Sequence, residues 1–99
     1  MGLAGNDSQN TFLVEHYRPG IGVEAFSEAA QRMCGVAEEM DTAASPIRFL
    51  HSTLVPEDET AFCVFRAPSQ AIVEEAYQRA GVPFDRIVSA LELGQPAGD

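Results

Sequence analysis

The two histidines of this chain are the side chains best suited to binding a metal ion. His16 and His51 carry imidazole nitrogens, which are good ligands for nickel, zinc and copper. Glu15, next to His16, could add a carboxylate oxygen. No His-x-x-x-His or Cys-x-x-Cys spacing accompanies them, so the sequence does not predict a preformed, tight site. Two interpretations stay open. Either each histidine is a structural residue bonded to the backbone, or His16, His51 and Glu15 contribute to a weaker surface site that a dimer completes.

The other side chains that could take part in a reaction are better explained by structural roles than by catalytic ones. The acidic run at residues 57–59 follows Pro56, which is ordinary turn composition, and negative charge near the end of a sheet discourages edge-to-edge association. Cys34 stands at the spacing of a helical core. Cys63 lies in the middle of a predicted strand, where a thiol has a raised pKa and little access to reagents. There is no nucleophile elbow and no glycine-rich phosphate loop, so the sequence names no catalytic residue.

Charge and composition exclude several classes of partner. The 99 residues hold fifteen acidic side chains against six arginines and no lysine, for a net charge of −9. Such a chain has no basic surface for nucleic acid or an anionic membrane, whereas cations are natural partners. Charges interrupt every apolar run well before the ~20 residues of a membrane span, and the first ten residues lack the features of a signal peptide. We therefore predict a cytoplasmic protein whose two cysteines are reduced.

The first half of the chain predicts a strand and a helix. Residues 11–17, TFLVEHY, are rich in aromatic and β-branched side chains and are followed by a Pro-Gly turn. Residues 23–41 carry apolar side chains at steps of three and four, which predicts an amphipathic helix. Gly35 disfavours this helix, and we expect it to mark close packing against a strand. The apolar positions of the helix are Phe26, Ala30, Met33, Ala37 and Met40.

The second half predicts two strands, a helix and a last strand. Residues 46–55 and 60–66 are the two strands, joined by the acidic turn. Ser69 is placed to cap the following helix through its hydroxyl. Gly81 is placed to end that helix in a left-handed conformation, and residues 84–93 form the last strand.

This order of elements, β-α-β-β-α-β, is that of the ferredoxin-like α+β fold. It predicts one antiparallel sheet with two helices on one face. Residues 11–93 form this single domain. Residues 1–10 and 94–99 are small and polar, and we expect them to be flexible, disordered tails.

One face of the predicted sheet is left uncovered by the helices. A hairpin loop with an even number of residues between the second and third strands divides their side chains into two sets, one on each face of the sheet. A slip of one residue in the strand register would exchange the two sets. The second set is too apolar to be left in water, so we predict a homodimer, sheet against sheet, as in dimeric α+β barrels. The set toward the helices is Leu50, Leu54, Ala61, Cys63 and Phe65; the uncovered set is Phe49, His51, Thr53, Val55, Phe62, Val64 and Arg66.

Three segments resemble a family of small ferredoxin-like bacterial proteins, common in actinobacteria. They are FLVEHYRPG at residues 12–20, HSTLVPEDET at 51–60 and FCVFRAPSQAIVEEAYQRAGVPFDRIV at 62–88. Most members of this family have no known function, and some are described as nickel-binding. The resemblance therefore implies a ferredoxin-like dimer and favours a divalent transition metal, nickel first. It implies no defined set of ligands.

Three hypotheses about function follow from the residues and the resemblance. The leading one is a non-enzymatic homodimer of unknown physiological role that binds nickel, or another divalent transition metal, through His16, His51 and nearby carboxylates. The alternative is a small-molecule binding protein or cofactor-free enzyme of the dimeric α+β barrel type, with His16 or Tyr17 pointing into a closed apolar pocket. The third is an interaction module whose uncovered sheet face binds a different protein.

Overall fold

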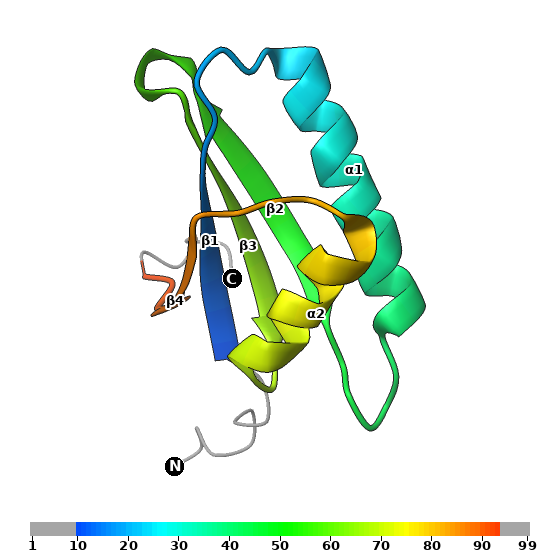
Figure 1. Ribbon diagram of the computed structural model, residues 1–99. Helices are drawn as coiled ribbons and strands as arrows, with labels where there is room; N and C mark the ends of the chain where they lie inside the picture. The colour runs from blue at the N-terminus through cyan, green and yellow to red at the C-terminus, as the bar shows by residue number, and fades with distance from the viewer. Residues whose placement is uncertain (1–9, 94–99) are drawn as a thin grey trace, which may run out of the picture.

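The computed structural model describes residues 10–93, which form a sheet and two helices (Figure 1). The predicted β-α-β-β-α-β order is confirmed. The tails expected at 1–10 and 94–99 lie outside the described residues, apart from Asn10, which begins the first strand. None of the described helices is long and apolar enough to cross a bilayer. The elements are β1 (Asn10–Tyr17), α1 (Val23–Met40), β2 (Arg48–Val55), the 3-10 turn η2 (Pro56–Asp58), β3 (Thr60–Ala67), α2 (Gln70–Ala80) and β4 (Arg86–Ala90).

The four strands form one antiparallel sheet in the order β2-β3-β1-β4. Both helices lie on the same side of this sheet (Figure 1). We call the other side, which no described helix covers, the open face. This is the ferredoxin-like α+β arrangement expected from the sequence. β4 is shorter than the predicted 84–93 because it pairs only with residues 11–15 of β1, while Phe84 packs toward the core.

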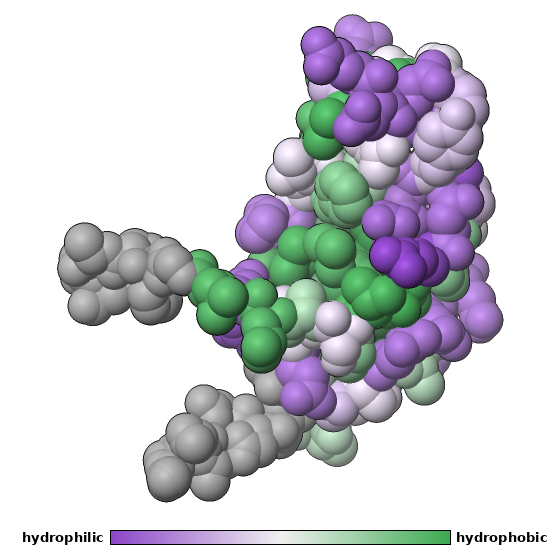
Figure 2. Space-filling model, turned by 90° about the vertical axis from the view of Figure 1, so that its left-hand side faces the viewer, coloured by the Kyte–Doolittle hydropathy of each residue, from purple (hydrophilic) through white to green (hydrophobic). Residues whose placement is uncertain are grey.

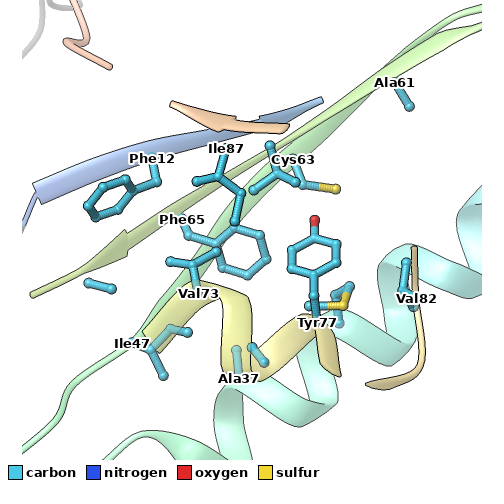
Figure 3. Packing of buried hydrophobic residues seen from close by; sticks show 14 of the residues in the cluster. Phe12, Ala37, Ile47, Ala61, Cys63, Phe65, Val73, Tyr77, Val82 and Ile87 are labelled. Carbon is cyan, nitrogen blue, oxygen red and sulfur yellow. The ribbon is translucent and has the colours of Figure 1, made fainter. Parts of the chain in front are cut away.

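The core lies between the sheet and the helices (Figure 3). It is built as the apolar periodicity predicts, because the helix positions at steps of three and four are the ones that face the strands. Tyr77 and Phe65 are the largest side chains that are fully buried, and their rings meet edge to face at 5.7 Å. The buried side chains include Phe26, Met33 and Ala37 on α1, Val73, Ala76 and Tyr77 on α2, Phe12 and Val14 on β1, and Cys63 and Phe65 on β3.

A β-bulge in β2 changes the register that the sequence predicted. Pairing between β2 and β3 shifts between Phe49 and His51, because Leu50 has no partner on β3. The expected position of Phe49 on the open face is therefore wrong: its ring packs edge to face on Phe65 at 5.2 Å, on the helix side. Leu50, expected toward the helices, is the extra residue of the bulge.

Beyond the bulge, the predicted alternation is confirmed. Leu54, Ala61 and Cys63 belong to the core or pack against it. The open face carries the alternate positions of the same strands. These are His51, Thr53 and Val55 on β2 and Phe62, Val64 and Arg66 on β3.

The helix ends follow the sequence signals in part. Gly81 ends α2 in the left-handed conformation, with φ of +69°, and its N–H bonds to the carbonyls of Gln78 and Tyr77. Ser69 occupies the N-cap position of α2, but its hydroxyl makes no capping hydrogen bond, so that part of the prediction is wrong. Gly35 does not mark a close approach either, because a Cβ built there would have nothing within 4 Å.

Replacing Gly35 with alanine is expected to stabilise the protein. The position is exposed, helical and free of steric neighbours, so alanine would raise the free energy of unfolding by about 0.5–1 kcal/mol. Urea denaturation of the parent and of Gly35→Ala measures the difference. Gly81→Ala is the matched control and should be destabilised, since its positive φ strains any other residue. A lower free energy of unfolding for Gly35→Ala than for the parent would contradict the absence of steric neighbours around Gly35.

Candidate functional site

His16 is a core residue and not a surface ligand. It lies on the helix side of β1, and only 4% of it is exposed. Its Nε2 atom is 3.0 Å from the hydroxyl of Tyr77, which comes from α2. The rings of Tyr77 and Phe26 lie against the imidazole, with centroids at 5.4 and 6.2 Å. A strand and both helices therefore enclose this side chain.

The Tyr77 hydroxyl joins His16 to Cys63 in a buried polar chain. Figure 3 shows the hydroxyl of Tyr77 pointing toward the Cys63 thiol on β3, with which it shares a hydrogen bond. The other side of the imidazole bonds to the backbone of Pro83, whose carbonyl can only accept. The ring therefore donates to Pro83, and Nε2 accepts the proton of the Tyr77 hydroxyl. This is the backbone-bonded, structural interpretation of His16 that the sequence left open.

Burial sets the protonation of all three groups. Desolvation, followed by the positive charge of Arg18, lowers the pKa of His16 from its usual 6.5 to about 4. Desolvation also raises the pKa of Cys63 to about 11 and raises the pKa of Tyr77. At neutral pH the imidazole, thiol and phenol are thus all uncharged. Both nitrogens of the imidazole are engaged, so neither offers a lone pair to a metal.

The other two predicted ligands lie on the open face. His51 is exposed on β2 opposite Val64. Glu15 lies on β1, where its Oε1 accepts a hydrogen bond from Nε of Arg86 at 3.0 Å. β3 separates these two strands, so two strand spacings, about 10 Å, lie between them.

The structure thus does not bring His16, His51 and Glu15 together within one chain. His16 faces the helices and the other two face away from them. Within residues 10–93 no group of three or more histidine, cysteine or acidic side chains is arranged to hold a metal ion. The candidates of the alternative hypothesis are also separated, because Tyr17 is 53% exposed on the side opposite His16.

The acidic turn is tied into the end of the sheet. Oε2 of Glu59 accepts a hydrogen bond from the N–H of Gly20 at 3.1 Å, and the carbonyl of Glu59 accepts one from Arg18. Glu59 itself adopts the left-handed conformation, with φ of +52°. These bonds hold the β2–β3 turn against the segment after β1, in agreement with a structural role. Both cysteines are free, with Cys63 buried and Cys34 half-buried.

Tyr77 is the residue whose role the sequence did not indicate. It stands in the apolar stripe of α2, where its spacing predicts a packing residue, and it is one. The signal that could have found the polar chain is the pairing of a core tyrosine with a histidine at an inward strand position. A buried phenol needs a hydrogen-bond partner, and few residues in this core can provide one.

The open face carries an apolar area at its centre. Figure 2 shows this side of the molecule, where hydrophobic residues gather across the middle and hydrophilic residues surround them. The area is larger than isolated surface residues would make, which is typical of a surface that meets a partner or a ligand. The half-buried or buried apolar side chains of this face are Leu13 on β1, Val55 on β2, Phe62 and Val64 on β3, and Val88 on β4.

The buried imidazole makes stability depend on pH. An unfolded chain protonates His16 near pH 6.5, and the folded chain only near pH 4. Between these values the unfolded state binds more protons, so stability falls as the pH is lowered. We expect His16 to account for a loss of about 2 kcal/mol of unfolding free energy between pH 7 and pH 5.

Urea denaturation at several pH values measures this loss. The comparison is His16→Leu/Tyr77→Phe, which removes both partners of the hydrogen bond between them. The carbonyl of Pro83 and the thiol of Cys63 also lose their partners, so the comparison is of the pH dependence and not of the absolute stability. The free energy of unfolding of the double variant should fall clearly less from pH 7 to pH 5 than that of the parent. If the double variant loses as much unfolding free energy as the parent, His16 is not the group whose protonation causes the loss.

Comparison with known proteins matches most of the chain to a family. Residues 12–89 match the family described as "Nickel responsive protein SCO4226-like". Among solved structures, the chain is similar to SCO4226 from Streptomyces coelicolor A3(2), with a TM-score of 0.69 and 23% identity over 85% of this chain and 99% of that one. At this identity the likeness shows the shared fold. The search of curated proteins found no match. The chain belongs to the SCO4226-like family of nickel-responsive proteins, a small actinobacterial family.

Proposed function

We propose that the protein is a nickel-binding homodimer in which His51 provides the imidazole ligand. The observation that carries this proposal is the exposure of His51 on an uncovered sheet face. Membership of a nickel-responsive family supports the choice of metal, and imidazole is a ligand that nickel prefers. His16 is not proposed as a ligand, because its ring nitrogens are bonded inside the core.

The donor set of a single described chain fits nickel only in part. One imidazole and scattered carboxylates do not make a chelating group within residues 10–93. A second copy of the chain would double the donors near the open face. Carboxylates of that surface, Glu15 among them, would complete the coordination, and Glu15 would exchange its bond with Arg86 for the metal. The net negative charge of the chain favours the binding of a cation.

The homodimer is proposed through the open face. Its support is the central apolar area of that face, which a second sheet would remove from water at ~25 cal/mol for each Å² buried. The small size of the domain adds weight, since a domain of this length buries a limited fraction of its own surface.

Removing His51 should weaken nickel binding. Calorimetric titration of the parent and His51→Ala with Ni²⁺ is expected to show at least a tenfold loss of affinity, about 1.4 kcal/mol or more. The His16→Leu/Tyr77→Phe protein is the matched control and should bind nickel as the parent does. Mg²⁺, which prefers oxygen ligands, should respond little to the loss of His51. Equal nickel affinity in the parent and His51→Ala would exclude this ligand.

Charging the apolar area should dissociate the dimer. We expect light scattering to give the mass of two chains for the parent and of one chain for Phe62→Glu, because a carboxylate would be buried unpaired in the interface. Ser27→Glu, on the exposed side of α1, is the control and should remain dimeric. A parent that has the mass of one chain at high concentration would refute the dimer, and with it the completion of the nickel site by a second copy.

A further inference from the structure

We propose that residues 91–93 of each chain form an arm that packs on a second copy of the chain. Leu93 would enter a hollow between α1 and β2 of that copy, with Leu91 packed beside it and Glu92 near its Arg48. This inference rests on the proposed homodimer, because it names the segment that each copy contributes beyond the open face.

The first observation is a pair of leucines left in water directly after β4. Leu91 and Leu93 are 84% and 85% exposed, more than any other large apolar side chain between residues 10 and 93. The arm borders the open face, because it lines a groove together with Leu13 and Val64, and it lies on the side of the sheet away from both helices (Figure 1). A second sheet stacked on the open face would therefore lie next to these leucines.

The second observation is a hollow of about 300 Å³ at the opposite edge of the sheet, where α1 ends and β2 begins. Its apolar lining is buried or half-buried, and its charged side chains are exposed. An apolar side chain that entered this hollow would leave water for apolar contacts. The lining residues are the apolar Ala37, Ile47 and Phe49, the half-buried Cys34, and the charged Glu38, Asp41 and Arg48.

The symmetry of a dimer can bring the arm and the hollow together. β2 and β4 are the two edges of the sheet, and each has a row of backbone groups without a strand partner. If the two-fold axis runs along the strands, the β4 edge of one copy lies over the β2 edge of the other, and like ends meet. Arg48 and Ala90 stand in one row across the four strands, so the hollow and the start of the arm are at the same end.

The arm is long enough to make this contact. Three extended residues span about 10 Å, which is also the distance between two packed sheets. Residue 93 of one copy can therefore reach the level of the second sheet. Because side chains alternate along an extended segment, Leu91 and Leu93 would point to one side and Glu92 to the other.

Charge complementarity supports the same arrangement. Arg48 makes no ion pair with any acidic residue between positions 10 and 93, and it stands beside the like charge of Arg66. Glu92 lies 3.6 Å from Arg66 of its own chain, but this pair is exposed and contributes little. The arm of a second copy would bring the carboxylate of its Glu92 to Arg48, which reduces the repulsion between the two arginines.

A disulfide crosslink tests the contact directly. Cys34 is a free, half-buried thiol that lines the hollow, so Leu93→Cys would place a second thiol next to it. We expect mild oxidation to give a covalent dimer whose peptides are joined between positions 34 and 93. The bond cannot form within one chain, because α1 packs on β2, and β2 and β4 are three strand spacings apart, about 14 Å. A disulfide needs Cα atoms within about 7 Å.

Three controls accompany the crosslink. Leu93→Cys/Cys34→Ser should lose the bond to position 34. Val23→Cys, at a 67% exposed position at the start of α1, should not bond to Cys34, which excludes random collision. Leu93→Cys/Phe62→Glu should lose the crosslink as well, because the arm reaches the hollow only when the open faces are stacked.

The affinity of the dimer provides an independent measurement. Light scattering over a dilution series should show that Leu91→Ser/Leu93→Ser raises the dissociation constant of the dimer at least about tenfold, whereas the matched control Val23→Ser leaves it unchanged. The arm is overturned if the parent has the mass of two chains but Leu93→Cys forms no bond to Cys34, or if the double serine variant dimerises like the parent. A parent with the mass of one chain would instead overturn the homodimer, and the arm with it.

Discussion

The hydroxyl of Tyr77 is a polar group at the centre of an apolar core, and the rest of the structure accommodates it. A phenol in this position must exchange its hydrogen bonds with water for bonds within the protein, or the fold loses on the order of 1–3 kcal/mol. His16 accepts its proton at 3.0 Å, and the Cys63 thiol shares its other side. Because the three residues come from β1, β3 and α2, this one chain of bonds fixes how the second helix lies on the two central strands.

That requirement places His16 in the core. Side chains alternate along a strand, so placing His16 toward Tyr77 places Glu15 and Tyr17 on the opposite face. The core then holds an imidazole that is neutral at pH 7 and has no free nitrogen. Of the two imidazoles, the one that is exposed is that of His51, on the open face. The buried imidazole of His16 and the exposed imidazole of His51 thus lie on opposite faces of the sheet.

The open face has an apolar centre and a charged end. The bulge in β2 determines which side chains of that strand lie on this face. The bulge turns Phe49 into the core, where it packs on Phe65. Arg48 precedes the bulge and pairs with Arg66, whereas His51 follows it and pairs with Val64. Without the bulge, the side chains would alternate strictly from Arg48 onward, and His51 would lie on the helix side of the sheet. One extra residue therefore allows a cationic pair and an exposed imidazole to share one face of the same strand.

By itself, the sequence determined the order of elements, the apolar stripes of both helices, the turn at Gly81 and membership of the family. These features are local or periodic, so residue type and spacing carry them. The tertiary structure decided the rest. The bulge at Leu50, the failure of Ser69 to bond as a cap and the partner of His16 depend on contacts between distant segments. A tyrosine in a helical stripe looks the same whether its hydroxyl meets water or an imidazole 61 positions away. Only packing α2 on the sheet brings the two together, because hydrogen bonding in a core depends on distance in space and not on distance along the chain.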